Sequence, residues 1–160
     1  MSEVARGRME FFDPLGHAFW TVIGVAILCG GVVGFERQVR GKPAGVRTSI
    51  LVCLGTAVFL HMAASVAGPN TDPTRVLGQL VTGIGFLGAG VMFSHEGTVT
   101  GVTTAAVIWV LAAIGATIGL GHFLGAIALS LVTVGILVGV ELLESSAKWL
   151  TRGAHQRSED

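Results

Sequence analysis

The sequence predicts an all-α polytopic membrane protein, a bundle of five transmembrane helices that pack through glycine. Apolar residues make up 51% of the 160 residues and charged residues only 12%, and the mean hydropathy is +0.74. A water-soluble domain of this size needs a more charged surface. The charged residues also gather at the ends of long apolar runs, which is typical of membrane proteins.

Five apolar runs follow one another along the chain. Each is close to the roughly 20 residues that a helix needs to cross the hydrocarbon core of a bilayer. The last two are separated only by GLGH, where we expect a tight turn, because more than forty apolar residues fit no single crossing. The expected spans are 15–35, 48–67, 76–93, 102–120 and 122–143.

The distribution of Lys and Arg predicts the orientation of the chain. The connection after the first run and the C-terminal segment are both rich in these residues. With five spans they lie on one side of the membrane, and an excess of Lys and Arg marks the cytoplasmic side. We therefore expect an extracytoplasmic N-terminal segment, a membrane domain and a cytoplasmic tail, at residues 1–14, 15–145 and 146–160.

Glycine is densest in the third run, in the sequence GIGFLGAG. Glycine lets a second helix backbone come close, so we expect helix packing here, within the subunit or between subunits. The alternative is an unwound segment at residues 85–90 whose carbonyl groups could bind an ion. The expected packing positions are Gly83, Gly85, Gly88 and Gly90.

The same small-residue spacing recurs elsewhere, in the pairs Gly30 and Gly34, and Gly115 and Gly119. The third run also satisfies the GxGxxG pattern of dinucleotide-binding proteins. That fold requires alternating strands and helices around the motif, and none is predicted here. Close helix packing is therefore the preferred interpretation of the glycines.

Candidate site residues gather in the half of the bundle predicted to face the cytoplasm. Glu36 and Arg40 are four residues apart, so they can pair on one helix face. The basic residues either anchor the topology and hold anionic lipid, or point into the bundle with Glu36 and line a site. The threonines that open the fourth run either bond their own helix backbone or bind a ligand. The candidates in this half are Glu36, Arg37, Arg40, Arg47, Thr103 and Thr104.

A second group of polar residues stands at the start of the third run. Asp72 followed by Pro73 is an ordinary helix start, with Asp as the cap. The alternative is a polar cluster of Asp72, Arg75 and Gln79 that forms a gate on the outer side. An amide such as that of Gln79, about one turn inside the lipid, is expected to find a partner across a helix interface.

Three separated segments, ERQVRGKPAGVRTSILVCLG, DPTRVLGQLVTGIGFLGAGVMFSHEG and GVTTAAVIWVLAAIGATIGLG, follow in this order. Together they resemble the N-terminal transmembrane domain of the MgtC/SapB family, without its soluble C-terminal domain. The resemblance implies a bacterial inner-membrane protein, associated with virulence and with growth in low magnesium. Some members are reported to act on the membrane ATP synthase. Thr103 stands where Asn is common in the family, and His95 where a basic residue is frequent.

Two hypotheses of function remain open, and neither is enzymatic, since no nucleophile and base pair or metal-ligand cluster is evident. The first is a protein of magnesium homeostasis that binds another membrane complex, such as ATP synthase. The second is a small transporter or channel for ions or a small solute, lined by polar residues such as Glu36 and Gln79. The acidic residues near the expected spans sit at their edges or in loops, namely Glu36, Asp72, Glu96, Glu141 and Glu144. Their absence from the interior of the spans counts against a dedicated pump for Mg²⁺, a cation that prefers oxygen ligands.

The sequence leaves the bound species open. Mg²⁺ is the one cofactor that the resemblance suggests, and the sequence identifies no residue as its ligand. A net charge of zero gives no signal for nucleic acid. The expected partners are the lipid bilayer, a membrane complex and a second copy of the chain in a dimer, because short helices with several small-residue faces bury little lateral surface.

Overall fold

A computed structural model describes residues 14–66, 72, 74–95 and 98–155. The predicted extracytoplasmic segment, apart from its last residue, Pro73 of the predicted helix start and the last five residues of the tail lie outside these ranges. Within them the chain forms five helices and one hairpin: α2 (His17–Val39), α3 (Val46–Val66), α4 (Thr74–Gly90), β1 (Phe93–His95), β2 (Thr98–Thr100), α5 (Val102–Gly119) and α6 (Phe123–His155).

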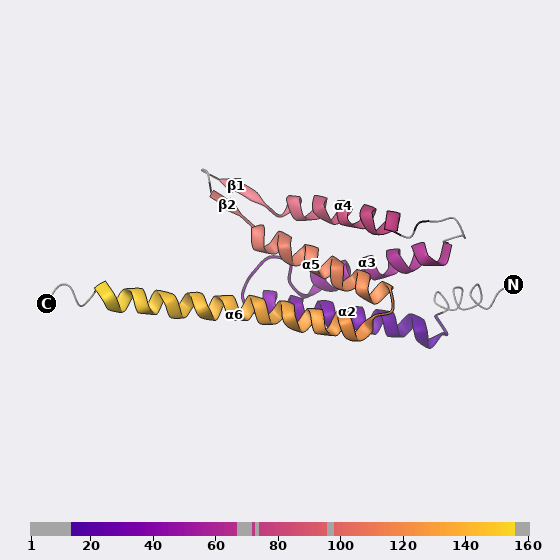
Figure 1. Cartoon of the computed structure of the whole chain (residues 1–160), viewed down its shortest axis with the longest axis horizontal. Helices are drawn as coiled ribbons and strands as arrows, with labels where there is room; N and C mark the ends of the chain where they lie inside the picture. The colour runs from indigo at the N-terminus through magenta and orange to yellow at the C-terminus, as the bar shows by residue number, and fades with distance from the viewer. Residues whose placement is uncertain (1–13, 67–71, 73, 96–97, 156–160) are drawn as a thin grey trace.

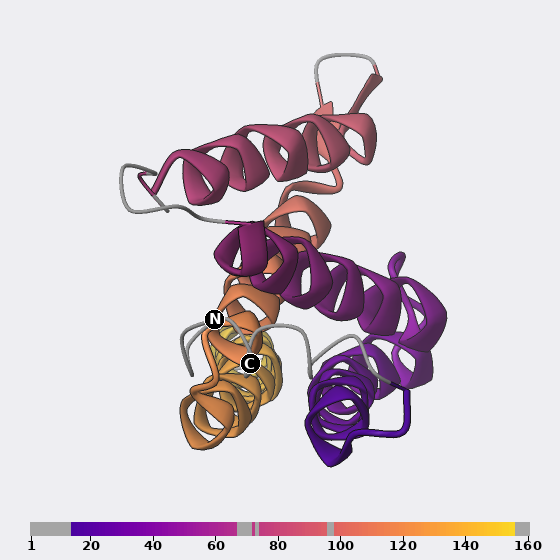
Figure 2. The same ribbon diagram turned by 90° about the vertical axis from the view of Figure 1, so that its right-hand side faces the viewer.

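The helices lie in three layers (Figures 1 and 2). Helix α4 forms one outer layer, α3 and α5 form the middle, and α2 and α6 lie on the opposite side. Helices α2, α3, α5 and the first part of α6 are long and apolar enough to cross a membrane. Helix α4 has 17 residues, at the short end of the range for a spanning helix. The predicted all-α membrane class is confirmed.

Glycines decide how closely the layers approach. A Cβ atom placed on Gly30 of α2 would lie 2.7 Å from Ile50 Cα of α3, and one on Gly119 of α5 would lie 2.7 Å from the Ala57 carbonyl oxygen. Real side chains do not approach backbone so closely, so these backbones pack as they do only because a side chain is absent. Gly34 and Gly115 face α3 in the same way. The close packing predicted from these two glycine pairs is confirmed. The same spacing at Gly121 and Gly125 and at Gly135 and Gly139 also predicts packing, but no atom of the described residues lies within 4 Å of the Cβ positions of Gly121, Gly135 and Gly139.

The buried centre lies where α2, α3 and α5 meet and is built of small and β-branched residues. Cys53 Sγ donates a hydrogen bond to the Leu111 carbonyl oxygen, 3.3 Å away, across the α3–α5 interface. The core includes Val22, Ala26, Cys29, Val33, Cys53, Ala57, Val107, Leu111, Ile114, Ile118 and Ala126.

The connection GLGH forms the predicted tight turn. Helix α5 ends at Gly119 and α6 begins at Phe123. Gly121 has φ +83°, and the His122 amide donates to the Thr117 carbonyl oxygen, 3.0 Å away. This bond and the left-handed glycine form a Schellman cap, which lets the chain reverse between two apolar helices.

Three expectations about element boundaries are corrected. Helix α2 continues to Val39 instead of ending near residue 35, so Glu36 lies inside the helix rather than at its edge. Helix α4 stays helical to Gly90, so the unwound segment at residues 85–90 does not form. The polar break after α4 contains an antiparallel hairpin that the sequence did not predict, with Ser94 paired to Val99.

The predicted boundary between membrane domain and tail at residue 145 is not a break in structure. Helix α6 passes through it and runs for 33 residues to His155. In Figure 1 this helix extends well beyond the end of the bundle. The change from apolar to charged residues therefore marks where the helix leaves the apolar layer rather than where it ends.

Replacing Gly30 by Ala is expected to destabilise the fold by about 1–3 kcal/mol, the usual cost of overpacking a core. The added methyl group would press on the α3 backbone. Gly24→Ala in the same helix is the matched control, because no atom lies within 4 Å of its Cβ position, and alanine favours helix. Unfolding in mixed micelles of SDS and a mild detergent measures both. Equal stability of the two variants would contradict the packing described here.

Candidate functional site

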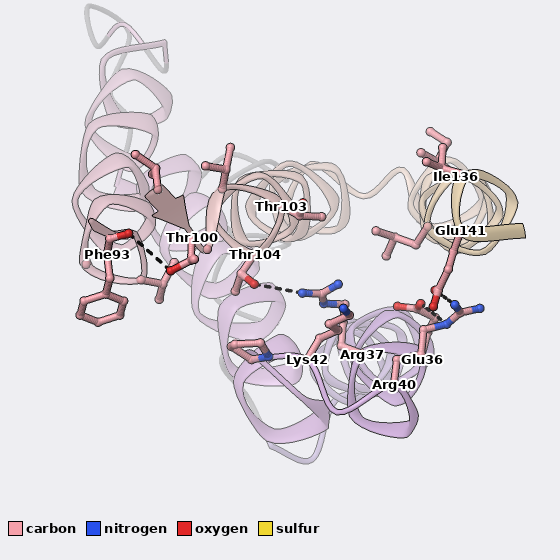
Figure 3. A pocket seen from close by; sticks show the side chains of 18 of the residues that line it. Glu36, Arg37, Arg40, Lys42, Phe93, Thr100, Thr103, Thr104, Ile136 and Glu141 are labelled. Carbon is pink, nitrogen blue, oxygen red and sulfur yellow. Dashed lines mark hydrogen bonds and ion pairs between the residues drawn. The ribbon is translucent and has the colours of Figure 1, made fainter. Parts of the chain in front are cut away.

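A cavity of about 1080 Å³ opens at the end of the bundle where α2 ends and α5 begins. Figure 3 shows side chains from α2, the hairpin, α5 and α6 around it. Its polar lining consists of Glu36, Arg37, Arg40, Lys42, Thr100, Thr103, Thr104, Glu141 and Ser145. Four elements distant in sequence thus contribute polar groups to one space.

Arg37 is the most enclosed charged residue of this cavity, only 4% exposed. Its Nη2 donates a hydrogen bond to Thr104 Oγ1, 3.0 Å away in the first turn of α5. Its Nε has no hydrogen-bond partner. A buried guanidinium group held by one neutral hydroxyl is poorly compensated, since charges buried in proteins are normally paired.

Arg40 joins two carboxylates from different helices. Its Nε lies 2.8 Å from Glu36 Oε1, one turn earlier in α2, and its Nη1 contacts the Glu141 carboxylate on α6. Glu36 is buried, and its second oxygen, Oε2, has no hydrogen-bond partner. The predicted pairing of Glu36 with Arg40 is thus formed, and it links α2 to α6.

The end of α2 brings a further cation to the cavity. Gly41 has φ +63°, and the Lys42 amide donates to the Arg37 carbonyl oxygen, 2.9 Å away. This is again a Schellman cap. It turns the chain back on itself, so that Lys42 lies beside Arg37 (Figure 3).

The hairpin positions the start of α5. Gly101, the N-cap residue, has φ +87° and forms no side-chain cap. A Cβ atom here would collide with the Val91 carbonyl oxygen, so only glycine fits between α4 and α5. The first amides of α5, those of Val102, Thr103 and Thr104, have no carbonyl partner within the helix. These three residues line the cavity.

The structure brings together five of the nine predicted site residues and separates the other four. Glu36, Arg37, Arg40, Thr103 and Thr104 all line the cavity. Arg47 and Gln79 line a different, apolar groove of about 720 Å³ between α3 and α4. Asp72 and Arg75 lie at the start of α4, at the opposite end of that helix from the cavity.

Asp72 caps the start of α4, as the first of its two interpretations predicts. Its Oδ1 accepts hydrogen bonds from the Thr74 hydroxyl and amide, at 2.7 and 2.9 Å. These bonds hold the pKa of the Asp72 carboxyl below its ordinary value. Among the residues that the structure places, the Arg75 amide donates to the Asp72 carbonyl oxygen, 3.3 Å away, but no side-chain hydrogen bond or ion pair joins Asp72, Arg75 and Gln79, so the alternative outer gate is not assembled.

Two charged residues of the site were not predicted, Lys42 and Glu141, nor were the hydroxyl residues Thr100 and Ser145. Lys42 was counted only as part of a basic connection, and the glycine before it was the available signal for the turn. Glu141 was placed at the edge of the last span. The antiparallel order of the spans puts that edge at the same end of the bundle as Glu36, and this could have suggested the pair.

The four predicted packing glycines of α4 differ in their surroundings. A Cβ atom on Gly88 would lie 3.6 Å from Ala105 Cβ of α5. No atom of the placed residues lies within 4 Å of the Cβ positions of Gly83, Gly85 and Gly90. Only Gly88 therefore packs inside the chain, and the outer face of α4 is uncovered.

Within the described ranges, no group of three or more His, Cys, Asp or Glu side chains is arranged to hold a metal ion. The two carboxylates of the cavity are both bound by Arg40. Three cationic and two anionic side chains line the space, an excess of one positive charge. This donor set fits poorly to Mg²⁺, which prefers several oxygen ligands.

Fold and cavity together define a small multi-helix membrane protein with a charged site at one end of its bundle. The chain belongs to the MgtC family, whose model matches residues 23–146. No solved structure matches the chain.

Several curated proteins are similar to this chain. Protein MgtC of Brucella abortus is 46% identical over 69% of the chain and 45% of its own length. Protein MgtC of Salmonella typhimurium is 43% identical over 77% of the chain and 51% of its own length. An Escherichia coli K12 protein named "Putative magnesium transporter YhiD" is 44% identical over 64% of the chain and 50% of its own length. The chain thus spans about half the length of these relatives.

Replacing Thr104 by Val should lower stability by about 1–3 kcal/mol, because a buried guanidinium group then loses its hydrogen-bond acceptor. Thr103→Val is the matched control. Thr103 is exposed and its hydroxyl takes part in no hydrogen bond with the residues described, so a change within about 0.5 kcal/mol is expected. Unfolding in mixed micelles again provides the measurement. If Thr103→Val were as unstable as Thr104→Val, the loss of stability would not come from the hydrogen bond between Arg37 and Thr104.

Proposed function

We propose that this protein of the bacterial inner membrane acts in magnesium homeostasis, and in adaptation to low magnesium, by binding another membrane complex through α4. The name of the Escherichia coli relative supports the connection with magnesium. The uncovered glycine face of α4 is the observation that supports a partner. ATP synthase is the candidate that the family resemblance suggests.

Helix α4 is attached to its own chain along one narrow strip. Of its 17 residues only Ile84 and Gly88 are buried. The exposed residues of α4 include Gly85 and Thr82, as well as Gln79, which lines the α3–α4 groove. In lipid, small residues let a second backbone come close, and an amide needs a hydrogen-bonding partner. A membrane helix from a partner would satisfy both requirements.

A small transporter or channel is the second candidate, and the polar cavity is the observation that favours it. Glu36, Arg37 and Thr104 line that space, while Gln79 lies in the α3–α4 groove. The path that would use all four residues is therefore not formed in this structure. A transporter would have to use the cavity alone, with a route to the other side that opens in another state.

We further propose that the cavity end faces the cytoplasm and the N-terminus lies outside. The basic residues at the end of α2 support this orientation. Single cysteines are introduced at Lys42 and at Asp72, two exposed positions at opposite ends of the bundle. A membrane-impermeant maleimide added to intact spheroplasts is expected to label Asp72→Cys and to leave Lys42→Cys unlabelled. Labelling of Lys42→Cys alone would reverse the orientation.

Gly85→Leu should abolish partner binding, because leucine would fill the space that a partner helix needs. No atom lies within 4 Å of its Cβ position, so the fold itself should tolerate the change. In-cell photocrosslinking from Val81, exposed on α4, followed by mass spectrometry identifies the partner. Growth of a deletion strain in low magnesium reports the physiological role.

Gly135→Leu is the matched control for this experiment. Gly135 lies on α6, is exposed, and also has no atom within 4 Å of its Cβ position. It should retain both the crosslink and growth. Crosslinks only to a second copy of the chain would contradict a separate complex as partner, and growth unaffected by Gly85→Leu would contradict the role of α4.

A further inference from the structure

We propose that the cavity at the start of α5 binds a phosphate-type oxyanion, held between the Arg37 guanidinium group and the first amides of α5. The ligand is either free phosphate or the phosphate of an anionic lipid. This inference concerns the cavity and not the exposed side of α4. A negative result for the partner of α4 would therefore leave it unaffected.

Arg37 provides the first part of such a site. It is 4% exposed, and one of its nitrogens, Nε, has no hydrogen-bond partner. Figure 3 shows its guanidinium group pointing from α2 to the first turn of α5. Both carboxylates nearby are already engaged by Arg40. Guanidinium groups recognise phosphate by charge and by paired hydrogen bonds, so an oxyanion would add to the partial charge compensation that Arg37 receives from Glu36.

The start of α5 provides the second part. Its N-cap is Gly101, which offers no side chain to the free amides. The residues that carry those amides, Val102, Thr103 and Thr104, line the cavity. The amino end of an 18-residue helix carries partial positive charge, and anions bind there. Arg37 is aimed at this point by its bond to Thr104, so two independent positive groups converge.

The overall charge of the lining favours an anion over a metal ion. Lys42 adds a third cation to Arg37 and Arg40, against the carboxylates of Glu36 and Glu141. A cation would meet this excess positive charge.

The remaining walls of the cavity allow either source of phosphate. Ile136, Leu137 and Val140 of α6 form one apolar wall, and Phe93 and Val99 of the hairpin form another on the opposite side. An acyl chain could lie along these residues while the headgroup reaches Arg37. Free phosphate would enter from the open end instead. The shared chemistry is the oxyanion, and the two sources are separable by experiment.

The test uses the full chain purified in an uncharged, phosphate-free maltoside detergent. Sodium phosphate is titrated in one arm, with sodium chloride at equal ionic strength as reference. Short-chain phosphatidylglycerol is titrated in the other arm. Calorimetry and the thermal midpoint report binding. We expect saturable binding and a raised midpoint in at least one arm. Binding in only one arm identifies the source.

Arg37→Gln is expected to weaken this binding at least ten-fold, because it removes a charge-assisted hydrogen bond. Arg75→Gln removes an equal charge at the far end of α4 and should bind like the wild type. Lys42→Gln, at an exposed position, should weaken binding several-fold and keeps the test valid if Arg37→Gln fails to fold. The proposal is overturned if neither ligand binds, or if Lys42→Gln and every folded Arg37 variant bind as Arg75→Gln does.

Discussion

The close approach of α3 to both α2 and α5 is the constraint on which the rest of the structure depends. It exists because glycine stands at the contact points, Gly30 and Gly34 on α2 and Gly115 and Gly119 on α5. Larger residues would hold these backbones apart. The hydrogen bond from Arg37 to Thr104 spans only 3.0 Å between α2 and α5, so the charged cavity requires the same close packing that the glycines allow.

The hydrophobic effect accounts for what the sequence predicted well. Lipid leaves the backbone no partner except itself, so long apolar runs become helices, and hydropathy located all five. Antiparallel order then placed Glu36 and Thr104 at one end. The end of α2 was missed because hydropathy falls at Glu36, whereas the helix stops only near Gly41, where the backbone can turn. The hairpin was missed because its strands are only three residues long.

The pair of Glu36 and Arg40 within α2 was predicted from the sequence and is formed, but the pairing between helices in the site was not. Glu141 reaches Arg40 because α6 lies against α2 in a particular register, and hydropathy does not specify register. The glycines of α4 illustrate the same limit. Four similar positions in one run were predicted to pack, but only Gly88 faces another helix of this chain. The spacing of residues along a helix shows which of them share a face, whereas the packing of the helices determines which residues that face contacts.

The length of α6 has a mechanical consequence. Its 33 residues correspond to about 50 Å of helix, while the apolar layer of a bilayer is about 30 Å thick. About 20 Å of rod must therefore project beyond that layer, on the side of the cavity. Since Arg40 ties this rod to α2 through Glu141, a tilt of the projecting part would pull on the ion pairs at the cavity wall. Motion of the projecting part of α6 would therefore be transmitted to the charged cavity through the ion pair of Arg40 and Glu141.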